Sequence, residues 1–374
     1  MKKLLGSNYK VSKVQISAKQ FFILSILFAV GDAIIYIPSL MAQEGLHTMW
    51  IAGLLGIVQA FVIAFIYTVI GKRILNNGYI YTLKRLFGSW IGQLLTVLFL
   101  LYVMVDIVLM IYEMGSFIVT MVMPTTPIES VLIAFLVVVI IGARLGLETL
   151  ARSAEILFPW FCFFYLLLVI LNIPNINLEN LQPLFEGSIY SIIKMNLPLA
   201  SYLLETVILI TLFPHINGQN KARSAYVMGV AVGVTLTVII SLLSLLVLGL
   251  HIIKISSFAS YMLGKSVIAN FFSHVEVTIA IIWFISVYFK ITLCFLILAK
   301  GISKLFKTED YRFITLPLGY LLYVLAFISL PSNMYLSDFI TSTWISYTLT
   351  FGLVFPLFIF GIGTLRKQHL HLKQ

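Results

Sequence analysis

The sequence predicts an all-α membrane protein whose ten transmembrane helices form two inverted halves. Its 374 residues are 61% hydrophobic and only 10% charged, which is too apolar for a chain whose surface faces water. The apolar residues gather in ten runs, each long enough to cross a hydrocarbon layer of ~30 Å. The first and the sixth runs contain helix-breaking residues near their middle. We expect a single integral membrane domain over residues 1–374.

The ten predicted spans are apolar stretches of at least ~17 residues, the length that a membrane helix needs. The third is longer than the membrane requires at ~1.5 Å of rise per residue, so it should tilt or protrude. In chain order the predicted spans are Phe21–Ala42, Thr48–Ile70, Ile91–Val122, Pro127–Ala143, Ala154–Leu171, Ile189–Phe213, Tyr226–Leu250, Val275–Ala299, Phe313–Leu330 and Leu336–Leu365.

The basic residues predict the orientation. With the N-terminus in the cytoplasm, 20 of the 24 lysines and arginines fall on the cytoplasmic side. By the positive-inside rule, this bias places both termini in the cytoplasm. The net charge of +10 therefore reports an orientation in the lipid bilayer and does not indicate a nucleic-acid partner. We expect residues 1–20 to be an uncleaved cytoplasmic segment and residues 366–374 a cytoplasmic tail.

Two spans carry breaks in their middle. Gly31-Asp32, with Pro38 after it, interrupts the first span, and Asn196-Leu197-Pro198 interrupts the sixth. A helix opened inside lipid leaves backbone N–H and C=O groups unpaired, which is tolerable only where they line a polar cavity or meet a ligand. The breaks therefore predict the place of a binding site.

The two halves share one plan. Residues 21–171 and 189–365 each hold five predicted spans, and because five is odd the halves have opposite orientations. Spans two and seven both carry small residues at helical spacing, which permit close helix packing, and spans three and eight both carry a polar stripe. This is the arrangement of the leucine-transporter type of fold, a 5+5 inverted repeat with broken helices 1 and 6. The alternative is a bundle in which Gly and Pro merely kink helices. The small residues are Ala52, Gly56, Ala60, Ala64, Gly229 and Gly233; the stripes are Tyr102, Asp106, Glu113, Ser116 and Thr120, and Glu276, Trp283, Ser286, Lys290 and Cys294.

The candidate ligand-binding residues surround the two breaks. Asp32 could bind a substrate ammonium group, although freed N–H groups of its own broken helix could equally satisfy its carboxylate. Beyond Pro198, hydroxyls and a carboxylate could recognise the polar groups of a small ligand, or could belong to a packing network. The predicted set is Gly31, Asp32, Asn196, Pro198, Ser201, Tyr202 and Glu205.

Three further ionisable residues lie within spans, where each costs about 2.5 to 3.5 kcal/mol on insertion scales. Asp106 and Glu113 are two helical turns apart, so they could be successive stations of a proton path or could pair with another span. Lys290 lies near the middle of span eight. We expect it to pair with Asp32 or with a span-three carboxylate, and a buried lysine could also support proton coupling.

The segment from Gly142 to Pro159 is the most distinctive polar stretch. Its charges, Arg144, Glu148, Arg152 and Glu155, recur on one helix face with alternating sign. This suits a cytoplasmic helix that enters span five and either docks a partner or is solvated. We expect neither a metal site nor a cofactor. The pair His369 and His371 lies in a polar tail, the other histidines lack ligand spacing, and the sequence shows no phosphate-binding loop or nucleophile elbow. An enzyme is therefore not expected.

The same stretch, together with the opening ISAKQFFILSILFAVGDAIIYIPS, resembles the endospore germination permease family, the B subunits of spore nutrient-germinant receptors. The resemblance implies ten helices of the leucine-transporter type, a place in the inner membrane of the bacterial spore, and assembly with A and C subunits. It also implies that a nutrient, often an amino acid, is sensed to trigger germination. The residues that carry it are Gln20, Gly31, Pro38, the run Gly146 to Arg152, Glu155, Pro159, Phe213-Pro214 and Leu330-Pro331.

Three functions follow from these observations. The leading hypothesis is a receptor subunit in which ligand binding between the broken helices shifts a conformational equilibrium. The second is an amino-acid/proton symporter that uses Glu113 and Lys290 as proton-coupled groups. The third is a cation-conducting channel subunit based on the acidic stripe of span three.

Overall fold

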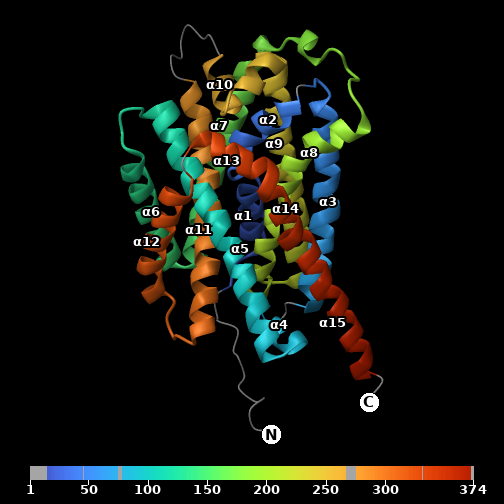
Figure 1. Ribbon diagram of the computed structural model, residues 1–374, viewed down its shortest axis with the longest axis vertical. Helices are drawn as coiled ribbons and strands as arrows, with labels where there is room; N and C mark the ends of the chain where they lie inside the picture. Colours follow the sequence, from blue (N-terminus) through green and yellow to red (C-terminus); the bar gives the residue numbers. More distant parts are fainter. Residues whose placement is uncertain (1–14, 45, 75–77, 267–274, 331, 372–374) are drawn as a thin grey trace.

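The chain folds as a bundle of ten membrane-length helices. The computed structural model describes residues 15–44, 46–74, 78–266, 275–330 and 332–371, and within them ten helices are long and apolar enough to cross a membrane. The first helix begins and the last helix ends at the same end of the bundle (Figure 1). We call this the near end and the opposite one the far end.

The first half of the chain contains five spans and seven α-helices. The first span is split into two helices, and a short helix, α4, connects the second span to the third at the near end (Figure 1). The elements are α1 (Ala18–Val30), α2 (Ala33–Met41), η1 (Ala42–Glu44), α3 (Met49–Ile74), α4 (Tyr79–Phe87), α5 (Ser89–Phe117), the π turn η2 (Ile118–Val122), α6 (Ile128–Leu145) and α7 (Leu147–Asn172).

The second five spans follow the short 3-10 turns η3 (Ile173–Asn175) and η4 (Leu178–Leu181). Here the connecting helix α10 joins the seventh span to the eighth at the far end (Figure 1), which makes it the inverted counterpart of α4. The elements are α8 (Ile189–Leu204), the 3-10 helix η5 (Glu205–His215), α9 (Gln219–Ile255), α10 (Ala259–Lys265), α11 (Glu276–Phe306), α12 (Arg312–Ser329), α13 (Asn333–Phe339), the π turn η6 (Ile340–Trp344), α14 (Ile345–Thr348), the π turn η7 (Leu349–Val354) and α15 (Phe355–His371).

The first span breaks where the sequence predicts. Gly31 has φ 25° and ψ −122°, outside the helical region, and separates α1 from α2. Its N–H still donates to the Leu27 carbonyl at 2.9 Å, whereas its own carbonyl accepts from the Ser286 hydroxyl at 3.1 Å. The break is therefore satisfied from a neighbouring helix, as a membrane interior requires. Pro38 lies inside α2 and does not end it.

The sixth span is discontinuous at a different place from the predicted one. Helix α8 continues through Asn196-Leu197-Pro198, and the backbone changes from α to 3-10 hydrogen bonding at Glu205. A proline is tolerated in a membrane helix when neighbouring groups satisfy the freed backbone, so Pro198 did not have to end the helix.

Side-chain donors stabilise the actual junction. The Leu204 carbonyl accepts from Tyr67 at 3.2 Å, the Leu203 carbonyl from Thr206 at 2.7 Å, and the Thr206 carbonyl from Tyr226 at 2.9 Å. Hydroxyl groups that bond backbone carbonyls in this way compete with regular helix bonding.

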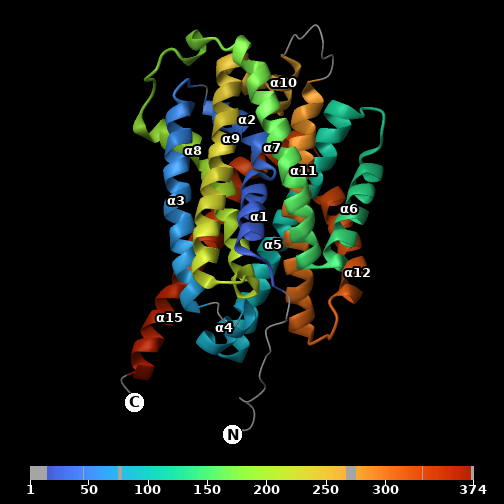
Figure 2. The same ribbon diagram turned by 180° about the vertical axis from the view of Figure 1, so that it is seen from behind.

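The small residues of spans two and seven pack as predicted, each against a broken span. A Cβ atom at Gly56 of α3 would lie 2.2 Å from Leu199 of α8, and one at Gly233 of α9 would lie 2.9 Å from the Ile26 carbonyl of α1. Helix α9 accordingly lies beside α1 (Figure 2). The second span of each half thus supports the first span of the other half, which is the relation that an inverted repeat requires.

Two further irregularities have no counterpart in the predicted spans. Gly249 interrupts α9 with φ 76°, and the last span contains the π turns η6 and η7. Hydrophobicity alone does not reveal such local changes of hydrogen bonding, because the apolar run continues through them. Turns of the π type occur frequently at functional sites, and η6 contributes to the site described below.

Candidate functional site

A buried ion network joins the two discontinuous spans to α11. The ammonium group of Lys290 hydrogen-bonds Asp32, at the break of the first span, and lies 2.5 Å from Oε2 of Glu205, at the junction of the sixth. All three residues are at most 3% exposed. Of the alternatives left open by the sequence, the structure has Lys290 paired with Asp32, and it adds Glu205 as a second partner.

The break in the first span makes room for this lysine. A Cβ atom at Gly31 would lie 2.5 Å from Cδ of Lys290, so the lysine stem packs where any other residue would carry a side chain. Asp32 is the N-cap of α2, but its side chain makes no capping hydrogen bond. Its carboxylate is therefore satisfied by Lys290 and not by the freed N–H groups of its own helix.

Glu205 is held from two directions. Trp344, in the π turn η6 of the last span, donates from Nε1 to Oε1 of Glu205 at 2.8 Å, while Oε2 faces Lys290. Glu205, in the sixth span, thus links α11 and the last span. Hydrogen bonds to ionised groups are stronger than those between neutral groups. Sequence reasoning missed Trp344. The available signal was its place inside a span, since membrane tryptophans usually lie at the water interface.

Glu113 of α5 is the least satisfied of the buried acids. Tyr202 donates to its Oε1 at 3.2 Å, whereas its Oε2 is buried with no hydrogen-bond partner among the described residues. Tyr36 donates to the Glu113 backbone carbonyl at 3.1 Å. Toward the far end of the site, Glu113 thus has a buried carboxyl oxygen that can still accept a hydrogen bond.

Asp106 lies two turns nearer the near end on α5. It is 1% exposed, and the Cys294 thiol is its hydrogen-bond partner at 3.7 Å. Among the described residues, the buried ionisable carboxyl and amino groups are those of Asp32, Asp106, Glu113, Glu205 and Lys290. Buried carboxyl groups therefore outnumber buried ammonium groups four to one.

The other predicted ligand residues make contacts within the helix bundle. Asn196 donates to the Ala52 carbonyl of α3 at 2.8 Å, and Ser201 donates to the Pro198 carbonyl at 2.7 Å. The structure thus brings Gly31, Asp32, Tyr202 and Glu205 together with Glu113 and Lys290, whereas the polar groups of Asn196 and Ser201 are engaged elsewhere.

The predicted docking residues lie at the near end, and two of them contact the chain's own N-terminal segment. Glu148 accepts from the Gln15 backbone N–H at 3.0 Å, and Glu155 accepts from Lys19 at 2.6 Å and from Gln20 at 3.3 Å. Of the two arginines, Arg152 is exposed, and the Arg144 backbone carbonyl accepts from Arg312 at 3.1 Å.

Aromatic side chains cover the ion network on both sides. Toward the far end, the Phe258 ring lies edge-on to Tyr36 at 5.5 Å and to Phe117 at 5.3 Å. Toward the near end, the Tyr102 ring stacks on Trp344 at 5.7 Å and on Phe351 at 5.4 Å. The network is therefore enclosed between two aromatic layers.

Cavities lie beyond each layer. At the near end, a cavity of about 570 Å³ lies between α4, α5, η5 and the end of α11, and Phe99 lines it. At the far end, a cavity of about 110 Å³ lies between α2, the end of α9 and α13, with Tyr36 and Phe258 among its lining residues. We call the latter the far vestibule.

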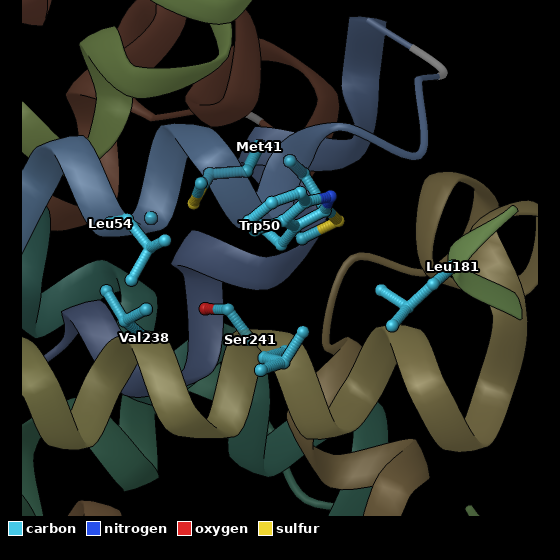
Figure 3. A pocket seen from close by; sticks show the side chains of 9 residues that line it. Met41, Trp50, Leu54, Leu181, Val238 and Ser241 are labelled. Atoms are coloured by element: carbon cyan, nitrogen blue, oxygen red, sulfur yellow. The ribbon is translucent and has the colours of Figure 1, made fainter. Parts of the chain in front are cut away.

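A third pocket is apolar and lies apart from the ion network. Its volume is about 220 Å³, and its lining comes from α2, α3, α9 and η4 (Figure 3). The Ser241 hydroxyl at its wall already donates to the Thr237 carbonyl at 2.9 Å. This pocket offers no charged group to a polar ligand.

Comparison with known proteins agrees with the fold and names the family. The family model described as "Spore germination protein" matches residues 15–334. The chain belongs to the spore germination permease family. Its Bacillus subtilis (strain 168) relatives include spore germination protein KB, 24% identical over 96% of this chain and 97% of the relative, and the putative spore germination protein YfkT, 25% identical over 86% of this chain and 89% of the relative.

The spore germination permease also resembles solved transporters in fold. The nucleobase-cation-symport-1 family transporter MHP1, in a closed conformation with bromovinylhydantoin bound, superimposes with a TM-score of 0.67 over 90% of this chain and 76% of its own, at 12% identity. MhsT in complex with L-phenylalanine gives 0.61 over 92% and 97%, at 15% identity. The fold is therefore of the leucine-transporter type, and family and fold are those of permeases and not of enzymes.

Proposed function

We propose that this permease is the nutrient-sensing subunit of a spore germinant receptor, with an amino acid as its ligand and the ion network as its binding site. It acts in the inner membrane of the bacterial spore, with both termini cytoplasmic, and assembles with A and C subunits. The near end then faces the spore interior and the far end faces outward, where the nutrient arrives.

The observation that carries this proposal is the position of Lys290. Its ammonium group bonds one acid at each helix discontinuity, Asp32 and Glu205, and each discontinuity is where a leucine-transporter fold exposes backbone groups to a ligand. The lysine holds the place between them that a ligand would enter.

A zwitterionic amino acid can enter this network without changing its total charge. Its ammonium group replaces Lys290 at one carboxylate, and its carboxylate group pairs with the released Lys290. Glu113 adds an oxygen without a hydrogen-bond partner among the described residues. An anion without an ammonium group would instead add a negative charge where buried carboxyl groups already outnumber ammonium groups, which costs several kcal/mol.

The network also provides a route from binding to response. It ties α1/α2, α8/η5, α11 and the last span through Asp32, Glu205, Lys290 and Trp344. A ligand shifts a conformational equilibrium only through different affinities for its two states. When the ligand's ammonium group replaces Lys290 at a carboxylate, the ion pairs and hydrogen bonds between these spans change. The partner subunits can then respond to the new arrangement of the spans.

The test is the nutrient response of spores that carry Glu205→Gln or Asp32→Asn. We expect both variants to accumulate and to need more nutrient, because each removes a charged partner of Lys290. The matched control is Glu129→Ala, at the start of α6. Unchanged responses in both site variants would contradict this site.

The second candidate is an amino-acid/proton symporter, favoured by the Glu113 oxygen that is buried without a partner among the described residues. A buried carboxyl group that has no ion-pair partner within a membrane span is a candidate carrier for a proton. Uptake of labelled amino acids into proteoliposomes under a pH gradient distinguishes the two. Uptake that depends on the gradient and is lost in Glu113→Gln would show that the protein is a symporter. Binding without uptake would support the sensing role.

A further inference from the structure

The far vestibule combines one cation with a set of hydrogen-bond donors and has no acidic side chain in its lining. Lys254, at the end of α9, is its charged lining residue. Asn333 uses Oδ1 to accept from Ser116, which leaves its NH₂ group as a donor. The Ser256 oxygen accepts from the Phe258 N–H at 3.2 Å, so its O–H also remains available to donate. Such a lining matches a carboxylate, which only accepts hydrogen bonds.

Lys254 differs from the other described lysines of the far end. Lys194 pairs with Glu44 at 2.7 Å, and Lys265 lies 5.1 Å from the centre of the Tyr261 ring. In the described part of the chain, Lys254 has neither a carboxylate nor a ring as partner. Its charge is therefore available to an anion that enters the vestibule.

The vestibule lies directly on the aromatic layer that covers the ion network. Tyr36 and Phe258 line it and are packed edge-on at 5.5 Å. The same Tyr36 donates to the backbone carbonyl of Glu113, whose carboxyl group belongs to the proposed site. A molecule held by Lys254 is thus separated from that site by one layer of side chains.

The size of the vestibule limits what it holds. A volume of about 110 Å³ exceeds several-fold the roughly 10–15 Å³ that a cavity needs to hold one water. This accommodates a charged head group, with the rest of the ligand pointing outward.

We infer that the far vestibule is an entry site for the carboxylate group of the nutrient, with Lys254 as its charged anchor. The inference rests on the proposed function, since it takes the nutrient to be an amino acid that arrives from the far end. A charge at the rim of a site changes mainly the rate of association and its salt dependence. Lys254 therefore attracts the ligand and holds it until the Tyr36–Phe258 layer opens.

The test needs no knowledge of the nutrient. Ser257, exposed beside Lys254, is replaced by cysteine in a chain with Cys162→Ser, and the protein is reconstituted in nanodiscs. The rates of modification by an anionic and a cationic methanethiosulfonate reagent are compared. We expect the anionic reagent to be favoured, and the anionic-to-cationic ratio to fall about threefold to tenfold in Lys254→Gln and in high salt. Lys265→Gln is the matched control and should leave the ratio near its original value.

A second arm tests the carboxylate directly. Single L-amino acids should slow the modification of this cysteine, whereas the corresponding amino-acid amides should not, and Lys254→Gln should abolish the difference. A ratio that Lys254→Gln leaves unchanged, or equal protection by acids and amides, would overturn the entry site. Different results would contradict the proposed function: no amino acid binds the protein, or spores with Glu205 variants show a normal nutrient response.

Discussion

Lys290 is a charge that the membrane interior accepts because two carboxylates surround it. Breaking a buried ion pair by removing one partner typically costs 3–5 kcal/mol, since the remaining charge stays buried and unpaired. In this protein, loss of Lys290 leaves Asp32 and Glu205 facing each other. Stability and ligand recognition are thus properties of the same three residues.

We predict that Lys290→Gln destabilises the folded protein by roughly 3–5 kcal/mol, measured as a loss of thermal stability in detergent or nanodiscs. The matched control is Lys194→Gln. That lysine pairs with Glu44 while its own side chain is 51% exposed, so its removal should cost about 0–1 kcal/mol.

A triple variant separates charge from function. Lys290→Met combined with Asp32→Asn and Glu205→Gln removes the three charges of the ion network together, so it should recover most of the lost stability while the nutrient response stays absent. Equal losses in Lys290→Gln and Lys194→Gln would mean that the network contributes little to stability.

We predict that Gly31→Ala also damages the site. The backbone there has φ 25°, which strains any residue with a side chain by about 1–3 kcal/mol. The added Cβ would also lie 2.5 Å from Cδ of Lys290, so the lysine must move. Thermal stability and nutrient response should both fall. Gly361→Ala, where no atom lies within 4 Å of the added Cβ, is the control; a Gly31→Ala protein that behaves like it would contradict the observed packing.

At the residue scale, the sequence predicts which ionisable residues belong to the site better than it predicts which residues they contact. Asp32, Glu205 and Lys290 stand out because ionisable side chains are rare in apolar spans. Which acid meets Lys290 depends on how three distant helices pack. The place of Trp344 inside a span is unusual, but only the structure shows that its N–H donates to Glu205.

At the level of elements, several of the residues that carry the family resemblance, among them Gln20 and Glu155, meet at the base of α1. Gln20 of α1 contacts Glu155 of α7, and Ile16 pairs with the chain after η5, donating to the His215 carbonyl at 2.9 Å. These contacts fasten the N-terminal segment to α7 and η5. They restrain the near end of the span that carries Asp32.

We predict that Glu155→Gln loosens this attachment, because the neutral amide loses its charged bond to Lys19 at 2.6 Å. Hydrogen exchange at the backbone N–H of Ile16 should speed up roughly twofold to fivefold, because an exposed ion pair contributes at most about 1 kcal/mol, while exchange within the centre of α7 stays the same. Glu129→Gln on α6 is the control. An unchanged exchange rate at Ile16 would show that the Glu155 contacts do not hold the segment.

The helix boundaries show where prediction from sequence stops. The first break was predictable because Gly31 and Asp32 place a helix-breaking residue and an ionisable one together inside an apolar run. The sixth span was predicted to open at Pro198, yet it changes at Glu205, because the hydroxyl groups that stabilise the junction come from Tyr67 and Tyr226 on other helices. No local pattern encodes such contacts.

For the whole molecule, the ion network lies between two aromatic layers, with a cavity beyond each. The near-end cavity is about 570 Å³ and the far vestibule about 110 Å³. In a leucine-transporter fold, the central site is reached from one end at a time as helices rock around it. The ten spans and the inverted halves were predictable from hydrophobicity and charge, whereas the sizes of these cavities depend on side-chain packing across both halves.

The most direct test is the binding of L-amino acids to the purified permease in nanodiscs, measured by calorimetry on the wild-type chain, Glu205→Gln and Glu44→Gln. A charged hydrogen bond contributes about 1.5–3 kcal/mol, so we predict that Glu205→Gln weakens binding by roughly 10-fold to 100-fold and that Glu44→Gln binds like the wild type. Equal affinities in all three proteins would contradict the claim that the nutrient binds where Lys290 joins the two broken helices.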